Sequence, residues 1–268
     1  MNRDEKIKRL LKSDSYNFAD LRDILELLRS EGGCPWDMEQ THESIRKDFI
    51  EETYEVIEAI DIGDEELLRE ELGDVLLQVF FHARIEEEKD TFNINDVVSD
   101  VCAKLIHRHP HVFGNISVKN SDEVLENWDN IKNEEKSRDT ITSRLRSVPI
   151  SFPALMKASK VGKRANVLDF PDEMSALDKI NEEADEIRAA LESGNRENLE
   201  EEIGDLLFSA ANLARKCSVD AEIALNNATE KFVNRFEKWE NLIISKNLDI
   251  EKLSEKEKNL IWDEIKQK

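Results

Sequence analysis

Apolar residues recur every three or four positions along most of the chain, which is the spacing that places side chains on one face of an α-helix. In the second half, Leu199, Ile203, Leu206, Leu207 and Ala210 keep this spacing and predict a buried helix face. The pattern predicts four helices in each half of the chain: 42–62, 65–89, 95–108 and 121–136, then 173–192, 196–216, 220–246 and 255–267. We therefore predict an all-α protein, with a further helix near the N-terminus.

The predicted helix ends and two glycines add detail to this pattern. Asn95-Asp96 and Ser254 are expected N-caps, and Gly63 and Gly194 are expected at the turns between helices. Gly73 and Gly204 lie inside predicted helices, where glycine costs about 1 kcal/mol relative to alanine. Their recurrence indicates either close contact between helices or room for a ligand.

The chain contains an internal repeat. With a shift of 131 positions, residues 51–85 align with residues 182–216 without a gap, and 14 of the 35 pairs are identical. The repeat predicts two tandem four-helix modules. Between them the helical pattern lapses, and Pro149 and Pro153 bracket a short apolar stretch. We place the first module at residues 1–140, a linker at 141–153 and the second module at 154–268.

Each module carries four acidic residues in the same arrangement. Residues three apart share a helix face, and the short turn at Gly194 makes the two helices antiparallel neighbours, so the four carboxylates can converge. Such a cluster repels itself unless a cation neutralises it, and oxygen-only ligands suit Mg²⁺, with Mn²⁺ as a substitute. The second-module residues are Glu183, Glu186, Glu202 and Asp205, and the first-module residues are Glu52, Glu55, Glu71 and Asp74.

A solvated helix face is the alternative interpretation of such acidic residues. Common ancestry alone could repeat a solvated face. Common ancestry does not, however, explain why the acidic residues are the same in both halves while their neighbours differ. Tyr54, Ile57 and Phe81 of the first half correspond to Asp185, Arg188 and Asn212 of the second. We therefore favour the metal site.

Basic and aromatic residues recur near these clusters. Lys231 and Arg235 match Lys104 and Arg108, and beside a metal site they are candidate phosphate ligands rather than a salt-bridged surface. Trp262 either stacks on a base or belongs to the core. The histidines 107, 109 and 111 flank Pro110, which ends a helix, so we interpret them as structural rather than as a zinc site.

Charge and composition limit the partners. The chain has 60 acidic and 38 basic residues and a net charge of -22, which disfavours binding to nucleic acid or to anionic membranes. Its three cysteines are far apart, and no apolar run is long enough to cross a bilayer. No signal-peptide pattern is present at the N-terminus, so we expect a cytoplasmic protein.

These motifs together resemble those of the MazG family of nucleoside triphosphate pyrophosphohydrolases, which belongs to the all-α pyrophosphatase superfamily. The resemblance covers nearly the whole chain. It includes G-G-C-P-W-D-x-E-Q-T-H-E-S at 32–44, R-H-P-H-V-F-G at 108–114, A-E-I-A-L at 221–225, both carboxylate quartets and both Lys-x-x-x-Arg segments. Where the family more commonly has a glycine- and tryptophan-containing stretch, this chain has Val-Leu-Asp-Phe-Pro-Asp at 167–172.

The resemblance implies a homodimer and Mg²⁺-dependent cleavage of nucleoside triphosphates between the α- and β-phosphates, with a broad choice of base and a role in cleaning the nucleotide pool. It implies that the second module is catalytic, with the quartet as metal ligands. Lys179, Lys231 and Arg235 would hold phosphates, and Trp262 would contact the nucleoside. Lys179 precedes Glu183 by one helical turn, whereas the first module has Asp48 at that place, so its cluster is more acidic.

Two other functions fit parts of this pattern. A di-iron bundle characteristically uses Glu-x-x-His pairs, and neither module supplies a histidine three residues after a motif glutamate. A non-catalytic nucleotide sensor or dimerisation module would need the same residues as the enzyme. Identifying the products formed from a nucleoside triphosphate would distinguish the non-catalytic module from the enzyme.

Overall fold

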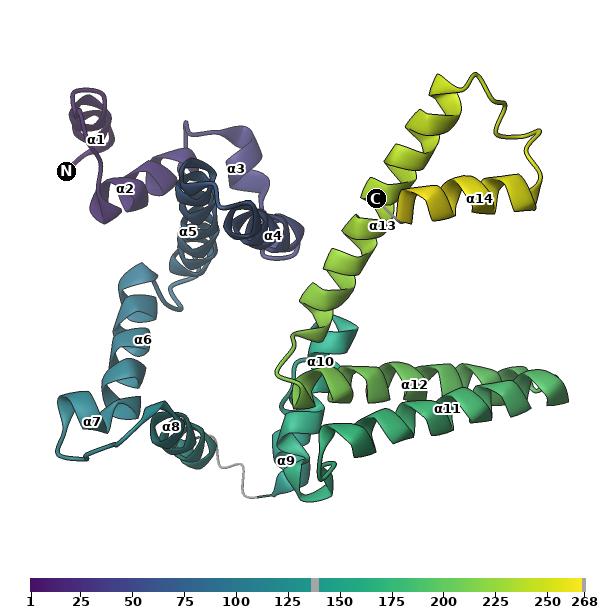
Figure 1. Cartoon of the computed structure of the whole chain (residues 1–268). Coiled ribbons are helices and arrows are strands. Elements are labelled where there is room, and N and C mark those ends of the chain that lie inside the picture. The colour runs from purple at the N-terminus through teal and green to yellow at the C-terminus, as the bar shows by residue number, and fades with distance from the viewer. Residues whose placement is uncertain (136–139, 267–268) are drawn as a thin grey trace. The chain divides into compact units, whose positions relative to one another are not determined.

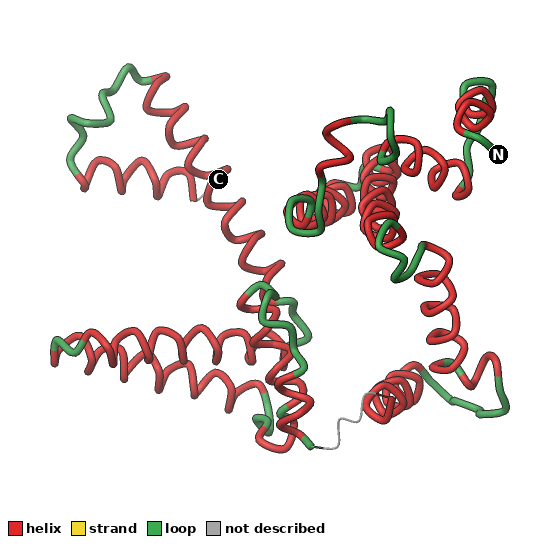
Figure 2. Tube along the Cα trace, turned by 180° about the vertical axis from the view of Figure 1, so that it is seen from behind, coloured by secondary structure: helices red, strands yellow, loops and turns green. Residues whose placement is uncertain are grey.

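The computed structural model describes residues 1–135 and 140–266, and within these residues all regular elements are helices (Figure 2). The chain divides into two compact units, Met1–Asp129 and Asn130–Lys268. This confirms the all-α prediction. The last predicted residues of two helices, 136 and 267, lie outside the described residues.

The first unit is built around the antiparallel pair α4 and α5 (Figure 1). The N-terminal region holds two helices rather than one, and α2 packs against α5. The helices are α1 (Arg3–Leu10), α2 (Phe18–Leu28), α3 (Pro35–Glu39), α4 (Arg46–Ile62), α5 (Glu65–Glu87), α6 (Ile94–Arg108), α7 (Pro110–Phe113) and α8 (Ser121–Glu135).

The turn between α4 and α5 follows directly from its sequence. Gly63 ends α4 with a φ of 71°, in the left-handed region that glycine adopts without strain. The Asp64 side chain then accepts hydrogen bonds from the Glu66 and Leu67 backbone N–H groups and begins α5. This tight turn places the acidic stretches of α4 and α5 side by side.

The core of the first unit lies where α2, α5 and α6 meet. It is formed by Leu25, Ile45, Phe80, Phe81, Ala83, Ile85 and Ile94. Burying such apolar side chains contributes roughly 1.5–3 kcal/mol for each large one. The core therefore fixes the C-terminal half of α5, and the carboxylates lie on its N-terminal half.

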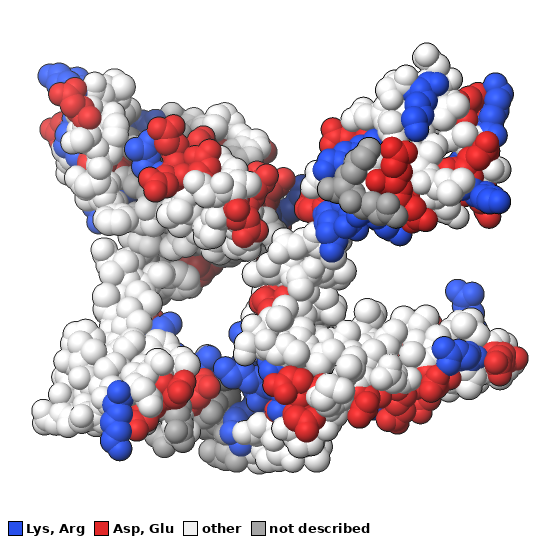
Figure 3. Space-filling model, in the orientation of Figure 1, with Lys and Arg blue, Asp and Glu red and all other residues white. Residues whose placement is uncertain are grey.

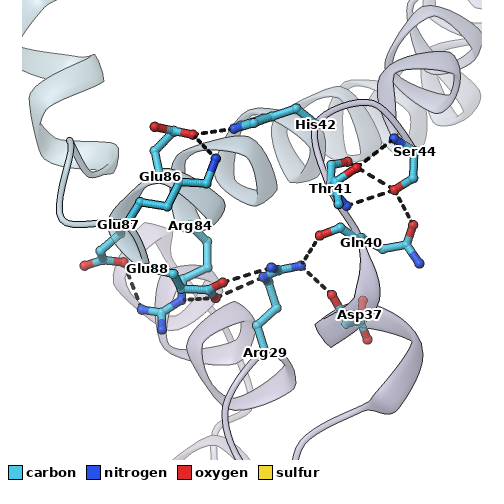
Figure 4. A network of polar contacts seen from close by, with 11 residues as sticks. Arg29, Asp37, Gln40, Thr41, His42, Ser44, Arg84, Glu86, Glu87 and Glu88 are labelled. Atoms are coloured by element: carbon cyan, nitrogen blue, oxygen red, sulfur yellow. Dashed lines mark hydrogen bonds and ion pairs between the residues drawn. The ribbon is translucent and has the colours of Figure 1, made fainter.

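A polar network holds the segment between α2 and α4 (Figure 4). The Arg29 guanidinium donates to the backbone carbonyls of Asp37 and Gln40 and forms an ion pair with Glu88 at 2.9 Å. Its side chain is only 5% exposed, and it lies 5.1 Å from the centre of the Phe81 ring. The buried Arg29 guanidinium thus connects the G-G-C-P-W-D segment to the end of α5.

The second unit repeats the hairpin with α11 and α12. Gly194 takes the place of Gly63, with a φ of 69°. The elements are α9 (Ile141–Arg146), α10 (Ala154–Arg164), the 3₁₀ turn η1 (Asn166–Leu168), α11 (Glu173–Ser193), α12 (Arg196–Lys216), α13 (Ala221–Ser245) and α14 (Glu255–Lys266). Helix α10 approaches α12 so closely that a Cβ on Gly162 would lie 1.9 Å from Asn212 Oδ1.

Three expectations about local structure need correction. Asn93, not Asn95-Asp96, caps α6, because its side chain accepts from the backbone while Asp96 bonds back to it as a capping box. Part of the expected linker is the helix α9, which Thr140 and Ser143 cap in the same way. The predicted apolar face of α12 is open: Ile203 and Leu207 are 44% and 52% exposed, because no helix of the unit covers them.

Candidate functional site

Three glutamates of the second unit converge at the α11–α12 hairpin. One carboxylate oxygen from each of Glu183, Glu186 and Glu202 lies within 4.8 Å of the others. Glu183 and Glu186 are three residues apart on α11, and Glu202 comes from the facing side of α12. The antiparallel turn at Gly194 therefore brings together carboxylates from both helices, as the spacing predicts.

Glu183 is the most enclosed member of this group. It is 3% exposed, and its Oε1 lies 2.9 Å from Lys179 Nζ. Its Oε2 is buried without a hydrogen-bond partner among the described residues. An unpaired carboxylate oxygen in a protein interior costs free energy unless a cation or a donor reaches it.

The proximity of the carboxylates changes their protonation. The nearby Glu183 carboxylate raises the pKa of Glu186, and partial desolvation and the negative charge of Glu202 add to that shift. The carboxylates of Glu182 and Glu183 raise the pKa of Lys179, which therefore stays charged. The cluster thus already attracts one cation, the Lys179 ammonium group.

The first unit holds the corresponding cluster of Glu52, Glu55 and Glu71, again within 4.8 Å. Partial burial, together with the neighbouring acids, raises the pKa of Glu52 to about 7 and raises the pKa of Glu71 as well. The lysine that assists the second cluster is replaced here by Asp48.

Asp205 and Asp74 do not belong to either three-carboxylate group. Asp205 is exposed, one helical turn beyond Glu202. Asp74 is near enough to contribute to the raised pKa values of Glu52 and Glu71. Their role as metal ligands stays a prediction.

Two glycines leave open space beside the clusters. A Cβ added to Gly204 or to Gly73 would meet no atom within 4 Å outside its own helix turn. Close contact with another helix of the same chain therefore does not explain these glycines. Room for a ligand, or contact with a helix of a second chain, agrees with the open space.

The predicted phosphate and base residues lie on other helices. Lys231 is exposed and Arg235 half-buried on α13, which diverges from the α11–α12 hairpin (Figure 1). Trp262 of α14 packs against Phe232, with 5.4 Å between ring centres, beside a hollow between α13 and α14. No hydrogen bond or ion pair joins these three residues to Glu183, Glu186 or Glu202 in the described part of the chain.

The matching residues of the first unit are arranged differently. Lys104 is exposed, but Arg108 is 7% exposed and its guanidinium lies 5.5 Å from the centre of the Trp128 ring. His109 packs against the same ring and places its Nδ1 2.6 Å from the carbonyl oxygen of Leu105. These contacts agree with a structural role for His109.

Sequence patterns did not predict a chain of polar contacts between the segment before α4 and the end of α5. The Nδ1 atoms of His42 and His82 are 2.7 Å apart, and His42 Nε2 lies 2.6 Å from Glu86 (Figure 4 shows this second contact). The ring planes differ by only 7° with 5.0 Å between centres, so the two rings lie edge to edge in one plane. Forty positions separate these histidines in sequence, and no local periodicity links them.

None of the described helices is long and apolar enough to cross a membrane.

Comparison with known proteins gives a consistent family. Residues 40–113 and 172–241 each match the MazG nucleotide pyrophosphohydrolase domain. A nucleoside triphosphate pyrophosphohydrolase/pyrophosphatase MazG of Thermotoga maritima is 43% identical over 258 residues, covering 96% of this chain and 98% of the relative. A nucleoside triphosphate pyrophosphohydrolase of Escherichia coli K12 is 43% identical over 248 residues, covering 91% and 94%. One of Mycobacterium tuberculosis is 41% identical over 150 residues, covering 55% and 44%.

Proposed function

Because this chain belongs to the MazG family and is a nucleoside triphosphate pyrophosphohydrolase, we propose that the second-unit carboxylate cluster performs its hydrolysis with Mg²⁺. Water is consumed, the linkage between the α- and β-phosphates breaks, and a nucleoside monophosphate and pyrophosphate leave. The observation that carries this proposal is the buried Glu183 Oε2, which has no partner among the described residues and belongs to a group of three converging carboxylates.

The residues of the cluster fit a hard divalent cation. All donors are carboxylate oxygens, which Mg²⁺ and Mn²⁺ prefer, and Glu186 and Glu202 are accessible enough for water and phosphate to complete the coordination. When bound, Mg²⁺ supplies charge neutralisation at the phosphates and acidifies a coordinated water. Glu183, Glu186 and Glu202 would hold it, with Asp205 as the expected fourth ligand.

The remaining residues of the proposed site bind and orient the substrate. Lys179 keeps its charge beside the cluster and is placed to meet a phosphate on that side. Lys231 and Arg235 carry two positive charges one helical turn apart on α13, and a guanidinium can bind a phosphate through two parallel hydrogen bonds. Trp262 lines an aromatic hollow and is the proposed contact for the base. The hollow beside Trp262 is open to solvent, which agrees with a broad choice of base.

We further propose that the protein is a homodimer. Exposed apolar residues lie on α12 and at the start of α13, where Leu207 and Ile223 are 52% and 47% exposed. Contiguous exposed apolar surface is typical of an interface. A second chain packed on these residues would cover them.

We assign catalysis to the second module, 154–268, and not to the first, 1–140, which the segment 141–153 joins to it. Lys179 partly neutralises the second cluster, whereas Asp48 adds charge to the first. A cytoplasmic enzyme that removes triphosphates from the nucleotide pool fits this activity. The first-unit cluster remains a proposed second metal site, with Lys104 and Arg108 as its proposed phosphate residues.

Product analysis tests the proposal. The purified chain is incubated with a panel of nucleoside triphosphates and Mg²⁺, and products are identified by chromatography and phosphorus NMR. We expect equal amounts of monophosphate and pyrophosphate for several bases, and loss of both when EDTA replaces Mg²⁺. Release of orthophosphate would contradict the site of cleavage, and absence of any product would favour a nucleotide sensor.

A further inference from the structure

The stretch from Thr140 to Leu168 differs in charge from the rest of the chain. It contains six of the 38 basic residues and none of the 60 acidic residues. The structure folds this stretch into α9, α10 and η1. Figure 3 shows basic side chains gathered over α9 and the adjoining end of α10, whereas acidic side chains line the α11–α12 hairpin. A chain with a net charge of -22 thus has a cationic surface over α9 and α10.

Three lysines of α10 form one face of that helix. Lys157, Lys160 and Lys163 are spaced three residues apart and lie within an arc of about 120° around the helix axis. Gly162, on the opposite side, is the residue that approaches Asn212 of α12. The three lysines, which we call the α10 basic stripe, therefore face away from α12.

The Glu222 carboxylate lies beside the start of α10, where its Oε2 accepts from the Met156 backbone N–H, but it does not form an ion pair with the α10 basic stripe. Among the described residues, no ion pair joins any of its lysines to a carboxylate, and Lys160 lies instead over the Phe152 ring at 5.9 Å. By contrast, Arg84 of α5 pairs with Glu88 four residues further on. Like charges three or four residues apart destabilise a helix by a few tenths of a kcal/mol for each pair. A self-repelling stripe of this kind is stabilised when an anionic surface covers it.

The same chain carries a complementary surface at the tip of the α4–α5 hairpin. Residues 51–74 contain eleven acidic residues and a single basic one, Arg69. Five of these acids lie outside the carboxylate cluster, are exposed, and make no ion pair within the described residues. They are Glu58, Asp61, Glu65, Glu66 and Glu70, which we call the acidic tip.

We propose that the α10 basic stripe docks on the acidic tip of a second copy of this chain. In a two-fold dimer each copy supplies one stripe and one tip, so the same contact forms twice. Lys160 and Lys163 are exposed and Lys157 is half-buried. Exposed helix side chains offer little enclosure for a small anion, whereas small-ligand sites are concave, so a protein surface fits better. The inference rests on the homodimer proposed above and adds a charged contact to its apolar one.

The test is a charge reversal in the full-length protein. Analytical ultracentrifugation measures the dimer dissociation constant at about 0.05 M and about 0.5 M salt, where exposed charges are weakly and strongly screened. We expect Lys157→Glu/Lys160→Glu/Lys163→Glu to raise that constant at least about tenfold at low salt, which is about 1.4 kcal/mol, and to abolish its rise with salt. The Lys→Gln triple variant should give a smaller change in the same direction.

The control changes net charge equally at another place. Lys8→Glu/Lys12→Glu/Lys119→Glu alters three exposed lysines of the first unit and should leave the dissociation constant within about twofold of wild type. Mixing the α10 reversal with Glu58→Lys/Asp61→Lys/Glu65→Lys should restore tight association between the two variants. Circular dichroism confirms that each variant is folded.

Other outcomes would overturn the inference. An equal effect in the control would mean general repulsion, and unchanged association in the α10 variant would mean that the contact does not form. A raised KM with an intact dimer would assign the stripe to nucleotide recruitment instead. A wild-type chain that is monomeric at both salt concentrations would refute both the dimer and this contact, while product analysis would still decide the hydrolytic function.

Discussion

Lys179 Nζ lies 2.9 Å from Glu183 Oε1 across one turn of α11, and the same turn of the first unit carries Asp48. The two carboxylate clusters share their spacing but differ in this one neighbouring charge. A lysine at this position stabilises ionised carboxylates before a metal arrives, whereas an aspartate opposes them. The residue at this position, Lys179 in the second unit and Asp48 in the first, therefore distinguishes two carboxylate clusters that otherwise share one motif.

Removing one ligand charge from the second cluster should abolish catalysis. Glu202→Gln keeps the size of the side chain, and we expect kcat/KM to fall at least about 100-fold, which is about 2.7 kcal/mol of transition-state stabilisation. The melting temperature should change little. Glu201→Gln, at the adjacent exposed residue outside the group, is the matched control and should retain activity. Activity near wild type in Glu202→Gln would refute this site.

The equivalent change in the first unit should have a different effect. Glu71 corresponds to Glu202 in the repeat, so Glu71→Gln removes the same charge from the other cluster. We expect steady-state turnover to stay within about threefold of wild type, which is less than 1 kcal/mol. Loss of turnover equal to that of Glu202→Gln would assign catalysis to both modules.

Magnesium should stabilise the protein by more than ionic screening does. A ligand that binds only the folded state adds about 2.7 kcal/mol at 100 times its dissociation constant. Thermal unfolding in MgCl₂ should therefore occur at a higher temperature than in KCl of equal ionic strength. Removing both clusters with Glu71→Gln and Glu202→Gln should erase the difference. An equal rise in KCl would mean that screening of the net charge explains the effect.

The metal-free protein should lose stability as pH rises through the acidic-to-neutral range. The pKa of Glu52 is about 7 in the folded chain, against an ordinary value of 4.5. Between these values the folded state keeps a proton that the unfolded state has released, so stability falls as pH increases across that window. Melting temperatures in EDTA should decrease from pH 5 to pH 7, and Glu52→Gln should flatten that part of the profile. Saturating Mg²⁺ should reverse the trend, because metal binding requires the ionised carboxylates.

Arg235 should act on substrate and not on folding. An exposed ion pair contributes only about 0–1 kcal/mol to stability, and Arg235 makes no ion pair within the described residues. Arg235→Ala should lower kcat/KM by about tenfold or more with little change in melting temperature. Arg235→Lys should recover only part of the activity, because a point charge cannot replace the two parallel bonds of a guanidinium. Unfolding of Arg235→Ala would identify the residue as structural.

The sequence predicts the helices and the converging glutamates because both depend on short-range spacing. Gly63 and Gly194 end helices as expected, since a left-handed residue is needed at each turn. Contacts between distant segments escaped prediction, as the pair His42 and His82 illustrates, because no period relates residues so far apart.

The apolar face of α12 shows another limit of sequence patterns. Periodicity identified Ile203 and Leu207 as facing a core but did not tell whether that core lies within one chain. In the homodimer that we propose, the pattern would describe an association surface. Similarly, spacing placed Asp205 on the helix face of Glu202 but did not predict that only three carboxylates meet.

The edge-to-edge contact between His42 and His82 extends the hydrogen bond between His42 and Glu86, so the positions of the protons on these three side chains depend on one another. Bonds from Lys89, Thr91 and His42 hold the pKa of Glu86 at about 2, so at neutral pH its carboxylate only accepts. A neutral His42 must then donate from Nε2 and accept at Nδ1. His82 in turn donates its Nδ1 proton and carries its lone pair at Nε2. When both rings are neutral, the ionised Glu86 carboxylate thereby sets the tautomer of each ring. The direction of these hydrogen bonds can then reverse only if every proton along the three side chains moves together.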